Sequence, residues 1–201
     1  MAEPVVHVVD DDEAIRESMG FLLDAAGLTA RTYGSALDLL QHLDRLEAGC
    51  IVTDVRMPGM NGLELVRRLK EQGVGHPMIV ITGHGDIPLA VEAMKAGVSD
   101  FLEKPFEEEA LLRAIRTALL QGERSQEDQA EKHRLRSIFE ALSPRERQVL
   151  EGVVGGKMNK VIAFELGISP RTVEVYRANM MSKTGAQGLS ELVRMVLLAG
   201  E

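Results

Sequence analysis

The stretch "CIVTDVRMPGMNG", residues 50–62, decides how this chain folds. It opens with apolar and β-branched residues, as a buried strand does, and the strand ends on a carboxylate, Asp54. A turn containing Pro58 and Gly59 follows almost at once. Aspartate is common where a turn begins, so Asp54 could simply suit this turn. The ends of the other strands must decide between that structural role and a chemical one.

Short apolar runs alternate with segments of helical periodicity throughout the first 120 residues. The intervening segments are apolar at i, i+3 and i+4, and most of them close with glycine. Runs that are apolar at successive positions are typical of parallel strands covered on both faces. The pattern therefore predicts an α/β fold, a five-stranded parallel doubly wound sheet of the flavodoxin-like kind. The strands are predicted at residues 5–9, 29–33, 50–54, 78–82 and 100–104.

The rest of the chain changes character. Residues 121–137 are strongly polar and rich in Glu, Gln, Lys and Arg, which predicts a linker, possibly a helical one. Residues 138–201 contain four helix-like segments and no strand pattern. The predicted organisation is thus an α/β domain at 1–120, a linker at 121–137 and an all-α four-helix domain at 138–201.

Composition limits the cellular setting. No apolar run approaches the length of a membrane span, and the N-terminus lacks a basic region followed by an apolar stretch. The single cysteine, Cys50, cannot form an intrachain disulfide and lies in a predicted strand, where it fills core space. These features predict a cytoplasmic protein without a membrane partner.

The net charge of −8 is unevenly distributed. The first 120 residues hold 20 Asp and Glu against 11 Lys and Arg, whereas the remainder has a net charge of +1. This asymmetry predicts different partners for the two domains.

Ionisable and hydroxyl side chains stand at four of the predicted strand ends: Asp10, Asp11 and Asp12, then Asp54, Thr82 and Lys104. Ligands of open parallel sheets bind outside these carboxyl ends. Clustered carboxylates repel one another, and Mg²⁺ with its preference for oxygen ligands would compensate them. An aspartate beside such a cation can attack a phosphoryl group. We therefore expect Asp54 as the nucleophile, with Thr82 and Lys104 bonding the phosphoryl oxygens, while Asp12 caps the following helix.

The motifs "VVDDDE", "VTDVRMPGMNG", "VITGHGD" and "DFLEKPF" resemble the receiver domains of two-component response regulators, across essentially all of residues 1–120. The resemblance implies phosphorylation of Asp54 by a sensor histidine kinase and a cis Lys104–Pro105 peptide. It implies a switch in which Thr82 moves inward and Phe101 follows. His84 is interpreted as a loop residue. The implied Mg²⁺ ligands are Asp11, Asp54 and the Arg56 carbonyl, with Asp10 helping through water.

A helix-turn-helix pattern follows in "NKVIAFELGISPRTVEVYRANMMSK", residues 159–183. Gly167 ends its first helix, Ser169 caps the second, and Pro170 takes the first helical position. Helical periodicity turns Val173, Tyr176 and Met180 inward and Arg171, Glu174, Val175 and Ala178 outward. The outward stripe suits base edges of DNA. The domain is only weakly basic, so a helical protein-docking module remains an alternative.

Residues 142–196 resemble the LuxR-type DNA-binding domain, and the whole chain resembles regulators of the FixJ type, which control nitrogen-fixation and microaerobic genes. This implies a transcriptional activator whose partners are promoter DNA and RNA polymerase. Glu174, Val175 and Ala178 would face bases, and the other candidates would meet phosphates or groove edges: Asn159, Lys160, Arg171, Thr172, Arg177, Asn179 and Lys183.

The same resemblance implies that phosphorylation creates a homodimer through the helix Asp86–Ala96 and frees a masked DNA-binding domain. The interface candidates are Val91, Met94 and Lys95.

Two other function classes stay open. A haloacid-dehalogenase-type phosphatase also uses Asp and Mg²⁺, but places its nucleophile after the first strand. A phosphorylation-independent adaptor would use the helical domain to bind protein. A receiver of this kind catalyses only its own phosphorylation and dephosphorylation.

Overall fold

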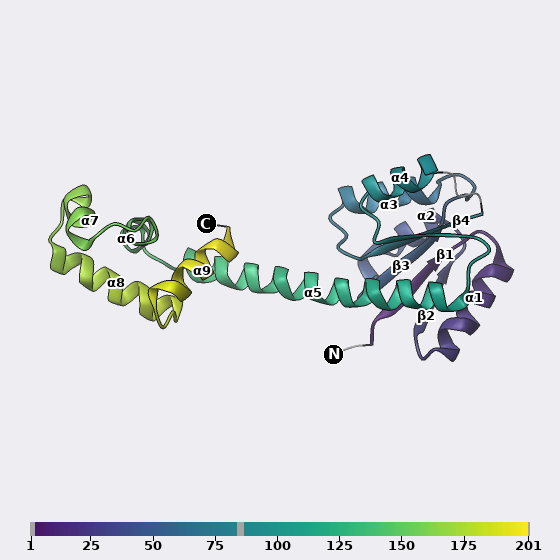
Figure 1. Ribbon diagram of the computed structural model, residues 1–201, viewed down its shortest axis with the longest axis horizontal. Helices are drawn as coiled ribbons and strands as arrows, with labels where there is room; N and C mark the ends of the chain where they lie inside the picture. Colours follow the sequence, from purple (N-terminus) through teal and green to yellow (C-terminus); the bar gives the residue numbers. More distant parts are fainter. Residues whose placement is uncertain (1–2, 84–86, 201) are drawn as a thin grey trace. The chain divides into compact units, whose positions relative to one another are not determined.

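The computed structural model describes residues 3–83 and 87–200, and the chain divides into two compact units, at residues 1–126 and 127–201 (Figure 1). Two positions named from the sequence, His84 and Asp86, lie outside the described residues. None of the described helices is long and apolar enough to cross a membrane.

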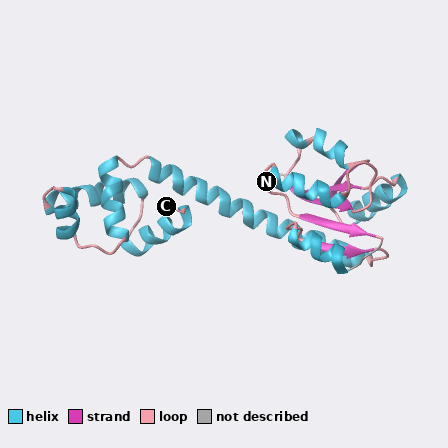
Figure 2. Ribbon diagram, turned by 90° about the horizontal axis from the view of Figure 1, so that it is seen from above, coloured by secondary structure: helices cyan, strands magenta, loops and turns pink. Residues whose placement is uncertain are grey.

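The first unit is built on a five-stranded parallel sheet, as predicted (Figure 2), and its strand order is β2-β1-β3-β4-β5. Its strands are β1 (Val5–Val9), β2 (Thr29–Tyr33), β3 (Gly49–Asp54), β4 (Met78–Thr82) and β5 (Asp100–Glu103). The chain passes from β1 to β2 on one side of β1 and then crosses to β3 on its other side, which makes the ends of β1 and β3 the switch point where ligands bind. The acidic residues that follow these two strands therefore meet at that point.

Helices cover both faces of the sheet, which confirms the doubly wound prediction. One core cluster joins α1 (Glu13–Ala25) and α5 (Glu108–Glu140) to strand residues such as Val8 and Ile79. The other joins α2 (Ala36–Gln41), α3 (Gly62–Glu71) and α4 (Ile87–Lys95) to residues such as Val9 and Val80. Neighbouring strand residues thus point to opposite faces, and both faces are apolar.

The second helical segment is shorter than its sequence pattern. Periodicity predicts one helix over residues 35–49, but α2 ends at Gln41 and a 3-10 turn, η1 (Leu43–Arg45), follows. The His42 side chain donates from Nδ1 to the Asp38 carbonyl at 2.8 Å. That carbonyl would accept the His42 N–H in a continuing α-helix. The His42 N–H bonds Leu39 instead, which tightens the turn.

The second unit contains α6 (Pro144–Val154), α7 (Asn159–Leu166), α8 (Pro170–Thr184) and α9 (Leu189–Ala199), and its described residues form no strand. These are the four predicted helices. Residues 121–137 lie within the long helix α5 and reach its last turn. Leu135 and Phe139, from its last turns, are buried in the same core as α6–α9. The core of the helical domain therefore begins inside the stretch that reads as a polar linker.

Candidate functional site

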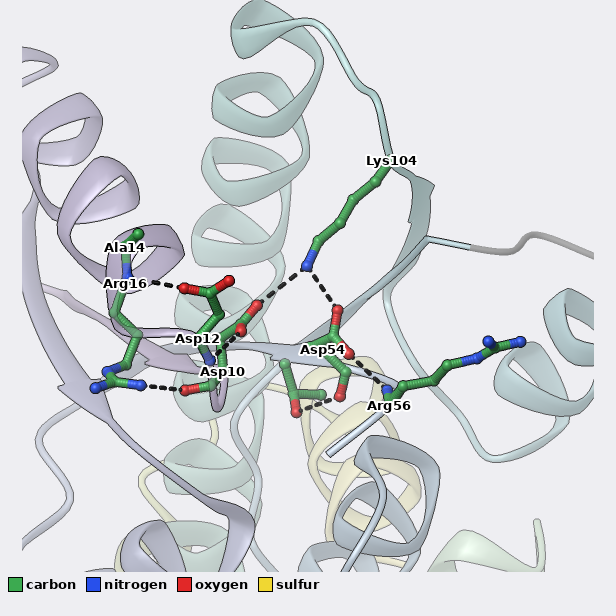
Figure 3. A network of polar contacts seen from close by, with 8 residues as sticks. Asp10, Asp12, Ala14, Arg16, Asp54, Arg56 and Lys104 are labelled. Carbon is green, nitrogen blue, oxygen red and sulfur yellow. Dashed lines mark hydrogen bonds and ion pairs between the residues drawn. The ribbon is translucent and has the colours of Figure 1, made fainter. Parts of the chain in front are cut away.

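An acidic edge forms where β1 and β3 end, with Lys104 reaching it from beyond β5 (Figure 3). The Lys104 Nζ lies 2.7 Å from Asp54 Oδ1 and 3.1 Å from Asp10 Oδ2. Both carboxylates are buried, and Lys104 is half-buried. One ammonium group thus bridges two acidic side chains that are 44 positions apart in the sequence.

Asp10 is held from two sides. The Asp12 N–H donates to Asp10 Oδ1 at 3.0 Å, and the Arg16 guanidinium donates to the Asp10 carbonyl at 2.8 Å. Burial raises the pKa of the Asp10 carboxyl, although the Asp12 N–H and the Lys104 ammonium oppose this rise. Asp12 itself accepts the Ala14 N–H at 2.9 Å, so its predicted role as the cap of α1 is confirmed.

Asp54 is oriented by the turn that follows it. The Arg56 N–H donates to Asp54 Oδ2 at 2.5 Å, while the Arg56 side chain points away from the carboxylate (Figure 3). The chain then returns so closely that a Cβ on Gly62 would lie 2.1 Å from the Asp54 carbonyl oxygen. Only glycine fits at that approach. The open turn includes Gly59 at φ +79°, in the left-handed region.

Lys104 is placed by β5 and by the peptide bond after it. The Lys104 N–H donates to the Thr82 carbonyl at 2.7 Å, and the Lys104–Pro105 bond is cis, as expected. Burial is the largest single influence on the pKa of Lys104 and lowers it. The hydrogen bonds and charges of Asp54 and Asp10 together outweigh burial, so the pKa lies above its usual value and the group is charged at neutral pH.

The two residues of the predicted switch lie on neighbouring strands. Thr82 ends β4 and is fully buried, and its strand partner on β5 is Glu103. Phe101 pairs with Val80, is half-buried and packs against the core beneath α2, α3 and α4. The structure therefore places Thr82 at the carboxyl end of its strand and Phe101 two positions before the strand partner of Thr82, while their movement on phosphorylation stays a prediction.

The residues present fit a hard divalent cation. Asp10 and Asp54 are buried, and each directs one carboxylate oxygen to the Lys104 ammonium, so this edge attracts cations. The exposed Asp11 lines, with Arg56, a recess of about 780 Å³. Within the part of the chain that the structure describes, no three His, Cys, Asp or Glu side chains are arranged to hold a metal by themselves. Mg²⁺ is usually bound by one or two carboxylates and keeps several water ligands, so a site that adds a backbone carbonyl and water to these carboxylates suits it.

Helix α8 has the faces that its periodicity predicts. Val173 and Met180 are buried and Tyr176 is half-buried. Ser169 accepts the Thr172 N–H at 3.1 Å, Pro170 is the first helical residue, and Gly167 ends α7 at φ +66°. Seven predicted DNA contacts are exposed: Lys160, Arg171, Glu174, Val175, Ala178, Asn179 and Lys183.

Four predicted DNA contacts bond inside the helical domain. Arg177 donates to Asn159 Oδ1 at 2.7 Å and so links α8 to the first turn of α7. Lys183 lies 2.7 Å from Glu146 Oε2. The half-buried Thr172 shares a 2.8 Å hydrogen bond with Ser169. The sequence analysis did not identify Glu146 as a structural partner. The only sequence signal for it is its position three residues after Ser143, which fits a capping box at the start of α6.

The predicted dimer surface lies on α4. Val91 is 46% exposed, Met94 is 56% exposed, and Lys95 is also exposed. Beside them, Glu92 pairs with Arg67 and links α4 to α3. The apolar side chains point away from the core cluster, as an interface would need.

Comparison with known proteins identifies the two units. Residues 6–116 match the model of the response regulator receiver domain, and residues 140–196 match that of bacterial regulatory proteins of the luxR family. The chain belongs to the response regulators. It is 54% identical over 195 residues to the transcriptional regulatory protein FixJ of Azorhizobium caulinodans, which covers 97% of this chain and 92% of that protein.

Solved structures of response regulators extend the match. StyR aligns with a TM-score of 0.85 at 45% identity, covering 98% of this response regulator and 99% of that chain. Full-length FixJ from B. japonicum aligns with a TM-score of 0.62 at 50% identity, covering 100% of this chain and 98% of that one. The receiver and LuxR-type domains predicted from the sequence are therefore confirmed.

Proposed function

We propose that this response regulator is a DNA-binding transcription factor switched by phosphorylation of Asp54. The observation that carries the proposal is the meeting of Asp54, Asp10 and Lys104 at the switch point of the sheet, on the same chain as a capped helix-turn-helix. Because relatives at 48–54% identity are called transcriptional regulatory protein FixJ, we further propose a cytoplasmic activator of nitrogen-fixation or microaerobic genes.

The chemistry is phosphoryl transfer to a carboxylate. One oxygen of Asp54 attacks the phosphorus of a phosphohistidine on a sensor histidine kinase. The new oxygen–phosphorus bond forms as the phosphorus–nitrogen bond breaks, and the electron pair of that bond leaves with the imidazole. Lys104, already 2.7 Å from Asp54, then bonds a phosphoryl oxygen, and the Thr82 hydroxyl donates to another.

We assign a magnesium site to Asp11, Asp54 and the Arg56 carbonyl, with Asp10 taking part through water. A bound Mg²⁺ would neutralise charge on the transferring oxygens. The protein's own part is to hold Asp54 on a rigid strand end, to present it through an open turn and to supply the ammonium of Lys104. The domain catalyses only its own phosphorylation and dephosphorylation.

The output follows from a shift between two populations of the receiver. We propose that the phosphoryl group draws Thr82 inward, that Phe101 fills the vacated space, and that the surface of α4 then dimerises. Dimerisation releases the helical domain and sets two copies of α8 on a two-fold promoter site, where they act with RNA polymerase. Glu174, Val175 and Ala178 of α8 face bases. Lys160 of α7, together with Arg171, Thr172 and Asn179 of α8, meets phosphates or groove edges.

Intact-mass spectrometry after incubation with acetyl phosphate and Mg²⁺ tests the phosphoacceptor. We expect a single phosphoryl adduct on the wild type and none on Asp54→Asn, because the amide lacks the nucleophilic carboxylate. The matched control is Asp44→Asn, a surface aspartate in η1, which should carry the adduct as the wild type does. An adduct that survives Asp54→Asn would remove Asp54 from the mechanism and favour the adaptor. Turnover of a phosphate ester would favour the phosphatase.

The dimer surface is tested by introducing charge. Val91→Glu should keep the phosphoryl adduct but lose the dimer, with the dimer dissociation constant rising at least about 10-fold, because a carboxylate would be buried at an apolar contact. Leu37→Glu on α2 is the control, because the Leu37 side chain is about as exposed as that of Val91, and this variant should dimerise as the wild type does. Light scattering before and after acetyl phosphate measures both. A wild type that dimerises without phosphate would contradict the switch.

A further inference from the structure

An ion pair that includes a buried carboxylate fastens the end of the recognition helix. Glu146 is the third residue of α6, is 4% exposed, and forms a capping box with Ser143. Its Oε2 accepts the Ser143 N–H at 2.7 Å and lies at the same distance from Lys183 Nζ. Lys183 belongs to the last turn of α8, so this single oxygen joins the start of α6 to the end of α8.

A buried carboxylate is stable only when its charge is compensated and its oxygens are hydrogen-bonded. The Lys183 ammonium and the Ser143 N–H lower the pKa of the Glu146 carboxyl, so the pair is charged at neutral pH. Lys183 also lies in the last turn of α8, where a cation is favourable beside free carbonyls. Glu146 thus bonds both Ser143 and Lys183 in the free domain, and the Lys183 side chain itself is 45% exposed.

From this geometry, and resting on the proposed DNA binding, we propose that Lys183 and Glu146 are positioning residues for the recognition helix and that Lys183 is not a phosphate contact. The side chains of Glu174, Val175 and Ala178 can meet base edges only when the position of α8 is held within about 0.5 Å and its orientation within about 20°. Arg177 and Asn159 fix the middle of α8, and the Lys183–Glu146 pair fixes its carboxyl end.

The test uses the full-length protein after acetyl phosphate treatment and a duplex that the wild type selects from random-sequence DNA. We expect Lys183→Ala to raise Kd about 10-fold, a coupling typical of contacting ion pairs, and Lys183→Arg to restore most of the affinity. The slope of log Kd against log salt concentration should not change, because no phosphate contact is lost. In a Glu146→Gln background, Lys183→Ala should have little further effect.

Lys160→Ala is the control for a phosphate contact, since Lys160 is exposed on α7. It should reduce the salt slope by about 0.9. If Lys183→Ala also reduces the slope by that amount, and does so equally in the Glu146→Gln background, Lys183 contacts phosphate and the inference is wrong.

Hydrogen exchange keeps the inference testable without DNA. Amides in the last turn of α8 should exchange faster in Lys183→Ala than in Lys183→Arg, while those of α9 should exchange alike in both. Equal exchange in the last turn would overturn the positioning role. A wild type that retains no duplex would refute the proposed function instead, and the exchange comparison would still decide whether the pair fastens α8.

Discussion

Lys104→Met is expected to slow phosphorylation of Asp54 by about 100-fold or more and to destabilise the receiver by about 3–5 kcal/mol. The reason is the position of Lys104 Nζ, 2.7 Å from Asp54 Oδ1 and 3.1 Å from Asp10 Oδ2. Removing the ammonium leaves two buried carboxylates facing each other without a cation. It also removes the group that would stabilise charge on the phosphoryl oxygens as the transfer proceeds.

Two measurements separate these effects. Urea unfolding in the presence of a chelator reports the change in free energy, because no divalent ion can then compensate the carboxylates. A time course of the intact mass with acetyl phosphate and Mg²⁺ reports the rate. Lys70→Met, at an exposed position near the end of α3, is the matched control, and its free energy of unfolding should stay within about 0.5 kcal/mol of the wild type. A Lys104→Met variant phosphorylated at the wild-type rate would restrict Lys104 to a role in folding.

The acidic edge could be predicted from sequence because a parallel sheet gathers strand ends. Each strand contributes its first residues beyond the carboxyl end to the same edge, so Asp10, Asp54 and Lys104 needed no long-range information to be placed together. The caps Asp12 and Ser169 were predictable for a similar reason, since a cap bonds a backbone N–H only two or three residues further on.

Contacts between helices were not predictable in the same way. Helical periodicity assigns Lys183 to the exposed part of α8, but it does not determine which way a long flexible side chain turns. The choice of Glu146 as its partner depends on how α6 packs on α8. The early end of α2 is a local feature that periodicity also misses, since periodicity does not show that the His42 side chain bonds the Asp38 carbonyl four residues back.

The polar composition of residues 121–137 conceals a different kind of contact. Leu135 is the one large apolar residue there, and its sequence context resembles a solvated helix. In the structure it is 1% exposed and packs in the core with α6–α9. Arg136 next to it donates to the Ala199 carbonyl at 2.8 Å, at the end of α9. The last turns of α5 are therefore part of the DNA-binding domain.

Leu135→Ala should consequently destabilise the second unit by about 2–5 kcal/mol, the cost of a cavity in a packed core. Since a small domain has only about 5–15 kcal/mol in total, its thermal transition should fall by roughly 10 °C or more. Differential scanning calorimetry of the full-length protein measures that transition. DNA binding should fail above the new transition temperature, because α8 has no stable support once the core opens.

Leu120→Ala makes the same substitution in the same helix, at a leucine that is 57% exposed. The change in helix propensity is the same at both positions. If the free energy of unfolding of Leu120→Ala stays within about 0.5 kcal/mol of the wild type, the effect of Leu135→Ala is due to burial alone. Equal transitions in both variants would show that α5 serves only as a connector. Unequal ones would mean that any fragment beginning at residue 138 lacks a core residue, and that the helix leaving the receiver is also a structural element of the domain that reads DNA.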